Sequence, residues 1–153
     1  GYLEGMQLLL PAALLVGVAR SITVVLQDGR IIDSILYGMA TPLASVSTTA
    51  AALLMVPLHA LLHVPVSSVS GQAALTMPIM VPLSDLLGVS RQATVLAYQV
   101  GAGLCELLTP TNGALMAILL AAKVPFGDWL RFATRGYALM LVIGVIGILV
   151  DDR

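Results

Sequence analysis

Long apolar runs alternate with short polar segments along this chain. The runs cover, in order, residues 5–26, 31–49, 50–88, 91–122 and 136–150. A helix needs about 20 apolar residues to cross a bilayer, so these runs predict transmembrane helices, except for 50–88, which is too long for one crossing. Residues 34–84 and 137–150 contain no Asp, Glu, Lys or Arg. The pattern therefore predicts an all-α, integral membrane protein.

Two polar clusters interrupt the most apolar stretches. They are Ser67-Ser68-Val69-Ser70-Gly71-Gln72 and Thr109-Pro110-Thr111-Asn112-Gly113. Hydrocarbon offers no partner to an unpaired backbone N–H or C=O, so helices break at membrane depth only where they line a cavity or water. We therefore expect residues 50–88 to form a re-entrant helical hairpin that turns at 67–71. Residues 91–122 are expected to form a broken transmembrane helix that Ser90 caps. Such breaks build the ligand sites of secondary transporters.

Each polar cluster is followed at once by the start of a helix. The first N–H groups of a helix lack intrahelical partners and carry a partial positive charge. Glycine lets an anionic group approach the backbone closely, and hydroxyls can donate to a carboxylate. We expect a small carboxylate-bearing substrate, although such clusters also serve as packing surfaces and kinks. The candidate substrate-binding residues are Ser67, Ser68, Ser70, Gly71, Gln72, Thr109, Thr111, Asn112 and Gly113.

A carboxylate precedes the second cluster by one helical turn, at Glu106. An ionisable group at membrane depth is costly and by default indicates an ion or proton role. Its structural alternative is pairing with a basic residue or a backbone donor. Together with carbonyls freed by the break, Glu106, Thr109 and Asn112 form the candidate site for a coupling ion, Na⁺ or H⁺.

Composition and charge exclude several other functions. Apolar residues make up 59% of the chain and charged residues 10%, against roughly half and a quarter in soluble domains. The net charge of −1 and the lack of a basic patch give no reason to expect nucleic acid as a partner. His59 and His63 have no third ligand nearby in the pattern, so we expect no metal site, and we also expect no cofactor.

The positions of the positive charges predict an orientation. Lys and Arg are more frequent on the face that receives residues 28–33 and 123–135, so the positive-inside rule makes that face cytoplasmic. We expect residues 123–135 to form a polar connector at the membrane interface, anchored by Trp129. The bacterial inner (plasma) membrane is the expected location.

Three segments carry a specific pattern: residues 70–80 (SGQAALTMPIM), 82–92 (PLSDLLGVSRQ) and 108–113 (LTPTNG). They resemble the YfcC-type family, which is grouped with the anaerobic C4-dicarboxylate carriers (DcuC-like) in the ion transporter superfamily. The likeness covers most of the chain from Gly17 onward. The family pattern often has Gly and Ser where this chain has Val69 and Asn112. Members are variously assigned to C4-dicarboxylates, short-chain fatty acids or basic amino acids, so the resemblance leaves the substrate class open.

The resemblance implies a secondary active transporter that works by ion coupling or by exchange, and not an enzyme. Residues 1–153 would form a single membrane domain, the C-terminal repeat of an inverted-repeat transporter. Its expected partners are the lipid bilayer, the small carboxylate and an N-terminal repeat outside this sequence; a homodimer is also compatible. The few apolar runs predict a fragment or one half of a larger transporter.

Two alternative functions remain open at this stage. A membrane-embedded serine hydrolase would use Ser67 or Ser70 as its nucleophile and His63 as its base. Against it, the sequence lacks a Gly-x-Ser-x-Gly elbow. The second alternative is a non-catalytic, truncated membrane subunit.

Overall fold

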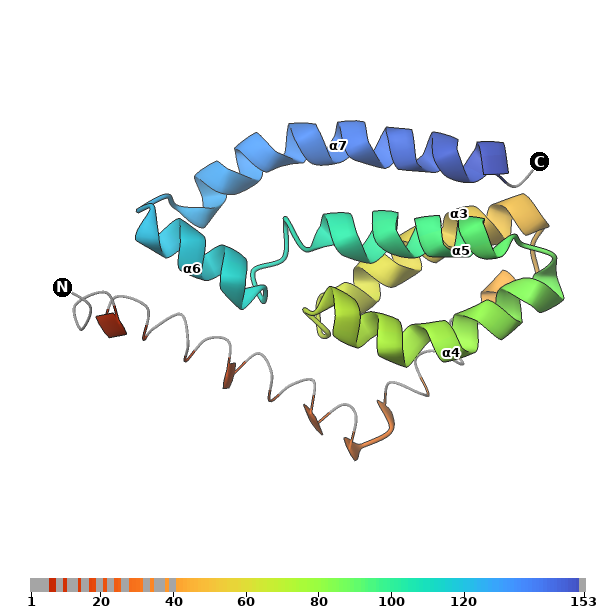
Figure 1. Cartoon of the computed structure of the whole chain (residues 1–153), viewed down its shortest axis with the longest axis horizontal. Helices are drawn as coiled ribbons and strands as arrows, with labels where there is room; N and C mark the ends of the chain where they lie inside the picture. Colours follow the sequence, from red (N-terminus) through yellow and green to blue (C-terminus); the bar gives the residue numbers. More distant parts are fainter. Residues whose placement is uncertain are drawn as a thin grey trace.

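The computed structural model of the chain describes residues 41–151 and, before them, positions 6–7, 10, 14, 17–18, 21, 24–25, 28–31, 34 and 38. Most of the expected span 5–26 and most of residues 31–40 of the expected span 31–49 therefore lie outside the described residues. Where residues are described, the regular elements are all helical, as the sequence predicts (Figure 1). These elements are α3 (Thr48–His63), α4 (Val69–Leu87), α5 (Arg91–Tyr98), the π-helix η1 (Gln99–Gly103), α6 (Gly113–Ala121) and α7 (Phe126–Asp151).

Helices α3 and α4 form an antiparallel hairpin, and α5 with η1 runs back beside it (Figure 1). α3 ends at His63 and α4 begins at Val69, so the chain reverses within the first polar cluster. The turn lies earlier than the sequence predicts, at residues 64–68 instead of 67–71, because Ser68 caps α4 by accepting the Gly71 N–H at 3.2 Å. Ser70 and Gly71 consequently lie in the first helical turn.

The corner between α4 and α5 is held by local side-chain chemistry. Gly88 ends α4 with φ of 74°, a left-handed conformation that glycine adopts without steric cost. Ser90 accepts the Ala93 N–H at 2.9 Å, which confirms its predicted role as the cap of α5. Asp85 and Arg91 form a two-pronged ion pair across the corner, at 3.0 and 2.9 Å. The hairpin and the broken helix are thus joined by a well-defined turn.

The helix after this corner loses regular α-helical geometry earlier than the sequence predicts. α5 passes at Gln99 into the π-helix η1, and a turn follows at residues 106–108. Two glycines in η1, Gly101 and Gly103, favour this departure because glycine is a poor helix former. Single π-turns inside helices are frequent at functional sites. The break thus extends from Glu106 to Asn112 instead of starting at Thr109.

The core of the bundle is built from small side chains that let helices approach closely. α3 packs against both α5 and η1, and α5 packs against α7. Ala51 and Ala52 of α3 and Ala93 and Ala97 of α5 are fully buried. A Cβ added to Gly101 would lie 2.9 Å from Cβ of His59 and closer still to the Val56 carbonyl oxygen. Small residues at such crossings are typical of helix packing in membranes.

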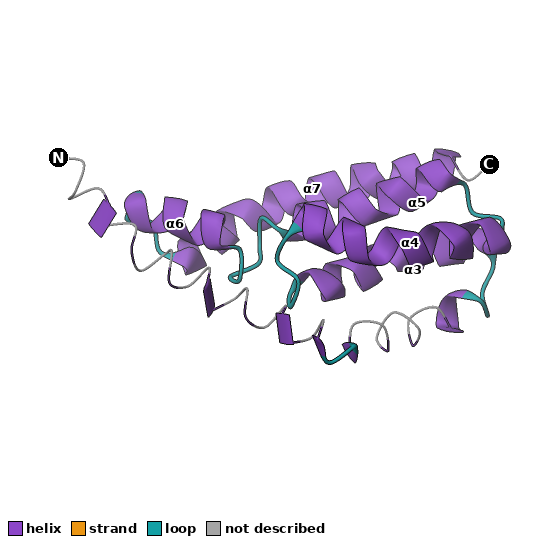
Figure 2. Cartoon of the chain, turned by 60° about the horizontal axis from the view of Figure 1, so that its bottom comes forward, coloured by secondary structure: helices purple, strands orange, loops and turns teal. Residues whose placement is uncertain are grey.

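The last helix is longer than expected. α7 begins at Phe126 instead of Gly136, so the predicted connector 123–135 is wrong in its second part, which is helical. Pro125 before the first turn and Asp128 within it are ordinary helix-start signals that the apolar pattern conceals. Among the described residues, α7 is the one helix long and apolar enough to cross a membrane. Figure 2 shows α3, α4, α5 and α7 gathered into a bundle, with α6 to one side, where it packs against α7.

Candidate functional site

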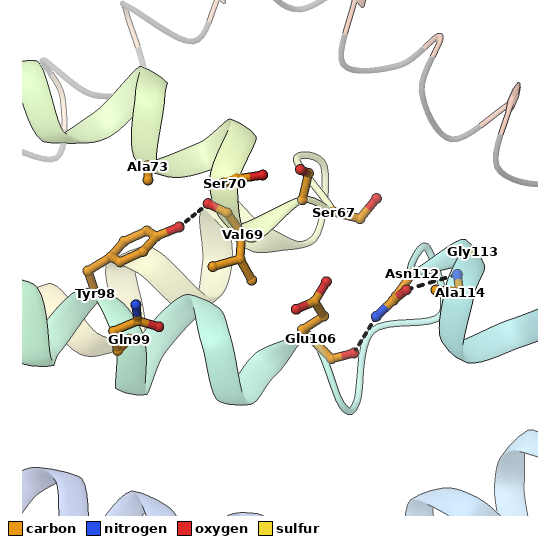
Figure 3. Close-up of a pocket in the computed structure, with 11 residues that line it drawn as sticks. Ser67, Val69, Ser70, Ala73, Tyr98, Gln99, Glu106, Asn112, Gly113 and Ala114 are labelled. Carbon is orange, nitrogen blue, oxygen red and sulfur yellow. Dashed lines mark hydrogen bonds between the residues drawn. The ribbon is translucent and has the colours of Figure 1, made fainter. Parts of the chain in front are cut away.

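A cavity of about 650 Å³ lies where the hairpin tip meets the broken helix (Figure 3). Three segments that are distant in sequence contribute to its wall: the start of α4, the junction of α5 with η1, and the break before α6. The lining residues are Ser67, Ser68, Val69, Ser70, Ala73, Tyr98, Gln99, Glu106, Asn112, Gly113 and Ala114. The two polar clusters of the sequence therefore share one cavity.

The first side of the cavity is the N-terminal end of α4. Ser68 caps this end, and Ser70 lies exposed in the first turn. The hydroxyl of Tyr98 donates to the Val69 carbonyl oxygen and so ties α5 to the hairpin tip. Within residues 41–151, the backbone N–H of Ser70 has no hydrogen-bond partner. A helix end with an unused N–H and a nearby hydroxyl is suited to an anion.

The opposite side is the N-terminal end of α6. The side-chain oxygen of Asn112 accepts the N–H groups of Ala114 and Leu115 at 3.0 and 3.2 Å. Its amide nitrogen donates to the Glu106 carbonyl oxygen at 3.2 Å. The Asn112 side chain therefore links the residues before the break to the first turn of α6, which is a structural role. Its amide nitrogen, the side-chain group that could donate to an anion, already donates to Glu106, so an anion at this end would meet the Gly113 backbone before the Asn112 side chain.

Glu106 places a carboxylate in the same cavity. It is partly buried in the turn that follows η1, and its side chain points toward the space between the hairpin tip and Asn112 (Figure 3). No ion pair of Glu106 occurs among the described residues. The cavity thus combines two electropositive helix ends with one negative side chain. That combination suits a solute with both a carboxylate and a cationic group, or a carboxylate with a cation.

Four of the predicted binding residues do not line the cavity. Gly71 donates its N–H to the Ser68 side chain that caps α4. The Thr109 hydroxyl donates to the Cys105 carbonyl oxygen at 2.7 Å. Thr111 donates to the Val64 carbonyl oxygen at 2.9 Å, so it ties the break to the end of α3. The fourth is Gln72. Of the predicted coupling-ion residues, Glu106 and Asn112 line the cavity and Thr109 does not.

Gln72, predicted as a ligand at the hairpin tip, is instead buried between the two arms of the hairpin. Its oxygen is 2.9 Å from Nδ1 of His63, and its nitrogen donates to the His59 carbonyl oxygen at 2.9 Å. Only 1% of Gln72 is exposed. Both ends of its amide are therefore used inside the protein, and the residue holds α4 against α3.

Replacing Gln72 with leucine should destabilise the hairpin without touching the cavity wall. The change leaves a buried imidazole N–H and a buried carbonyl without their partner, and each such group costs about 1–3 kcal/mol. We expect a clear fall in the midpoint of thermal unfolding of the purified protein. Gln92→Leu, on the exposed face of α5, is the matched control and should change stability little. Equal midpoints for the two variants would contradict this role of Gln72.

The two histidines lie inside the bundle and not at a membrane interface. His59 and His63 are both fully buried, and the His59 ring stands edge-on to Tyr98 with centroids 5.1 Å apart. Within the described residues, no group of three or more His, Cys, Asp or Glu could hold a metal ion. His63 Nδ1 contacts Gln72, and the buried His63 Nε2 has no hydrogen-bond partner among the described residues, so the described structure does not form the His63–Ser67 or His63–Ser70 pair that a hydrolase would need.

Tyr98 and Gln99 are lining residues that the sequence patterns did not single out for the site. Tyr98 is the last residue of α5 and Gln99 is the first residue of η1, and the Tyr98 hydroxyl reaches the Val69 carbonyl oxygen at the hairpin tip (Figure 3). A polar Gln99 in an apolar run, followed by two glycines, is the one local signal for them. The π-turn itself could not be predicted, because no residue pattern requires it.

The chain is similar over its whole length to known carrier sequences. The sequence profile of the C4-dicarboxylate anaerobic carrier family matches residues 1–152. The "Putative basic amino acid antiporter YfcC" of Escherichia coli (strain K12) is 36% identical over 150 residues, which is 95% of this chain and 30% of that protein. An "Uncharacterized protein" of Haemophilus influenzae is 34% identical over 150 residues, 98% of this chain and 29% of that protein. The chain therefore spans less than a third of the length of these relatives. No solved structure matches it significantly.

Proposed function

Because this chain belongs to the C4-dicarboxylate anaerobic carrier family, we propose that it is the C-terminal repeat of a secondary active transporter in the bacterial inner membrane. The transporter moves a small carboxylate-bearing metabolite by alternating access. The observation that carries the proposal is the meeting of two helix N-termini, those of α4 and α6, at one cavity. An N-terminal repeat outside this sequence would complete the site, as in other inverted-repeat transporters.

In this mechanism the substrate carboxylate binds between the two helix ends. The N–H groups of Ser70 and Gly113 and the hydroxyls of Ser67 and Ser70 would donate to it, because no described residue uses those two N–H groups. Helix ends favour an anion and need no positively charged side chain. The hairpin tip and the break would then separate or approach as the site opens to one side of the membrane.

Glu106 favours an amino acid as the substrate. Its carboxylate faces the same cavity, so a dicarboxylate would bring further negative charge beside it. A solute with an ammonium group would instead neutralise Glu106 while its carboxylate binds the helix ends. The printed name of the Escherichia coli relative, a putative basic amino acid antiporter, agrees with this choice.

A C4-dicarboxylate or short-chain fatty acid is the second candidate, supported by the family to which the chain belongs. It would require Na⁺ or H⁺ at Glu106 to cancel the carboxylate charge, so its transport would be coupled to that ion. The two candidates therefore differ in whether the cation in the site is part of the substrate.

Counterflow into proteoliposomes would test the proposal on the protein at its full natural length. Vesicles loaded with unlabelled arginine, succinate or butyrate are given the same labelled solute, with and without Na⁺ and at two pH values. We expect exchange of arginine without added Na⁺. Ion-dependent exchange of succinate or butyrate would favour the second candidate. Exchange of none of the three, with hydrolysis of a test ester, would favour the hydrolase; inactivity in every assay would favour the non-catalytic subunit.

Ser70→Ala should weaken substrate binding without disturbing the fold. The Ser70 hydroxyl makes no hydrogen bond within the described structure and lies in the cavity wall. Loss of one hydrogen bond to a charged carboxylate, about 1.5–3 kcal/mol, corresponds to roughly a 10- to 150-fold fall in affinity. Thr134→Ala, which removes an exposed hydroxyl from α7, is the matched control.

The apparent affinity is measured by substrate-induced stabilisation against heat. Asn112→Ala is a poorer test of binding because it also removes the cap of α6; Asn112→Ser keeps a capping oxygen and should retain the fold. Unchanged affinity in Ser70→Ala would reject the proposed site, whereas Asn112→Ser should keep the affinity because the Asn112 side chain is a cap and not a ligand.

A further inference from the structure

A second cavity, of about 490 Å³, lies along the N-terminal half of α7. Its wall is mostly apolar and aromatic, and it includes Leu107 from the break and Trp129 from the first turns of α7. It shares no lining residue with the cavity at the hairpin tip. Its chemistry therefore needs a separate explanation.

Two arginines without ion-pair partners line this second cavity. Arg131 and Arg135 are four residues apart on α7, so they project from the same face of the helix. Both are exposed, and neither forms an ion pair with any residue that the structure describes. Lys123 adds a third cation to this stretch, against one carboxylate, Asp128. Two neighbouring guanidinium groups with no acid to neutralise them are suited to a phosphate.

The position of the arginines along α7 corresponds to a membrane interface. Residues 137–150 contain no charge, so Arg131 and Arg135 stand where the apolar part of the helix begins. Trp129 is a tryptophan, one of the residue types that are enriched at membrane–water interfaces. From the arginines the cavity extends to Leu139 and Met140, which belong to the apolar part. Only 6% of the apolar stretch of α7 is buried, so the other described residues leave most of it uncovered.

We propose that this cavity binds one anionic phospholipid. Its phosphate lies between Arg131 and Arg135, and an acyl chain lies along Leu139 and Met140. The proposal rests on the membrane location that the proposed function includes. A free phosphate would satisfy the two arginines but would leave the apolar part of the cavity empty, whereas a phospholipid matches both parts.

The bound lipid would contact the side chain that supports the broken helix. The Trp129 indole N–H donates to the Leu107 carbonyl oxygen at 2.8 Å. In an uninterrupted helix that carbonyl would accept from Thr111, four residues further on, so the indole replaces a bond that the break removes. Trp129 and Leu107 both line the proposed lipid site. The lipid would therefore stabilise the hydrogen bond between Trp129 and Leu107, and with it the conformation of the break, from a cavity separate from the substrate cavity.

Native mass spectrometry of the full-length protein, in detergent with phosphatidylglycerol and phosphatidylcholine of identical acyl chains, would test this. We expect preferential retention of phosphatidylglycerol. The double variant Arg131→Gln/Arg135→Gln should reduce that retention roughly 20-fold, because each arginine near anionic lipid contributes about a factor of five. Lys123→Gln removes a cation outside the cavity and should change retention much less. Unaltered thermal unfolding of the double variant would show that it is folded.

Several results would overturn the lipid site. Equal retention of the two lipids, or retention that the double variant does not alter, would do so. If millimolar inorganic phosphate binds through the two arginines while no lipid is retained, the cavity is a free-anion site. If the rest of the full-length protein fills the cavity, no lipid is retained in any variant, which also rejects the proposal. Transport plays no part in these measurements, so failed substrate exchange with intact lipid retention would count against the proposed substrate alone.

Discussion

Glu106→Gln is expected to abolish uptake of a cationic amino acid by the full-length transporter. The substitution keeps the size and hydrogen-bonding capacity of the side chain but removes the one charge that the described residues place in the cavity wall. Hydrogen bonds to charged groups contribute about 1.5–3 kcal/mol, and any coupling ion would lose its anionic ligand as well. We therefore expect uptake to fall by about 10- to 100-fold or more, measured as initial rates in proteoliposomes.

Two comparisons isolate the role of this charge. Asp128→Asn neutralises a carboxylate of α7 outside the cavity and should leave uptake near the parent value. If Glu106 instead holds a coupling ion, Glu106→Gln should yield succinate exchange that no longer depends on Na⁺ or pH. Unchanged uptake together with unchanged ion dependence would remove Glu106 from the mechanism.

Gly101→Ala is expected to cause the largest loss of stability of any single methyl group added to the bundle. At Gly101 a new Cβ would meet the Val56 backbone, which cannot move aside without shifting α3, and Cβ of His59 at 2.9 Å. Overpacking of this kind typically costs about 1–3 kcal/mol. Heat unfolding followed by circular dichroism should show a midpoint lower by roughly 5 °C or more.

Gly136→Ala provides a control of the opposite sign. A Cβ at Gly136 would meet nothing within 4 Å, and alanine is favoured over glycine in a helix by about 0.5–1 kcal/mol. The same added methyl group should thus stabilise α7 and destabilise the α3–η1 crossing. Two variants that shift the midpoint in the same direction would show that this close crossing is absent from the folded protein.

Much of the architecture follows from the sequence because its signals are local. A cluster of serines and glycine in an apolar stretch predicts a helix end wherever it occurs, and α3 and α4 do meet at the first cluster. Ser90 caps α5 because a serine before a helix accepts the first free N–H groups whatever surrounds it. The membrane-spanning runs before residue 41 are predicted on the same kind of signal, and most of their residues lie outside those that the structure describes.

The directions of the side chains could not be read from local signals in the same way. On α4 the buried positions recur every four residues, at Gln72, Thr76, Met80 and Ser84, while Ser70 and Ala73 face the cavity. Because three of these four buried residues are polar, the sequence does not show that they form the buried face of α4. Gln72 therefore resembles a ligand, although its side chain joins α4 to α3. Tyr98 and Gln99 lie where α5 passes into η1 and line the same cavity, which no local pattern in the sequence predicts.

The sequence by itself determined where helices stop, which family the motifs resemble and which residue types surround the breaks. Only the tertiary structure decided that Glu106 shares a cavity with the ends of α4 and α6, and that Gln72, Thr109 and Thr111 hold the protein together instead. The reason is physical. Caps and turns depend on neighbours within a few residues, whereas a binding wall depends on how helices from distant parts of the chain rotate and cross when they pack.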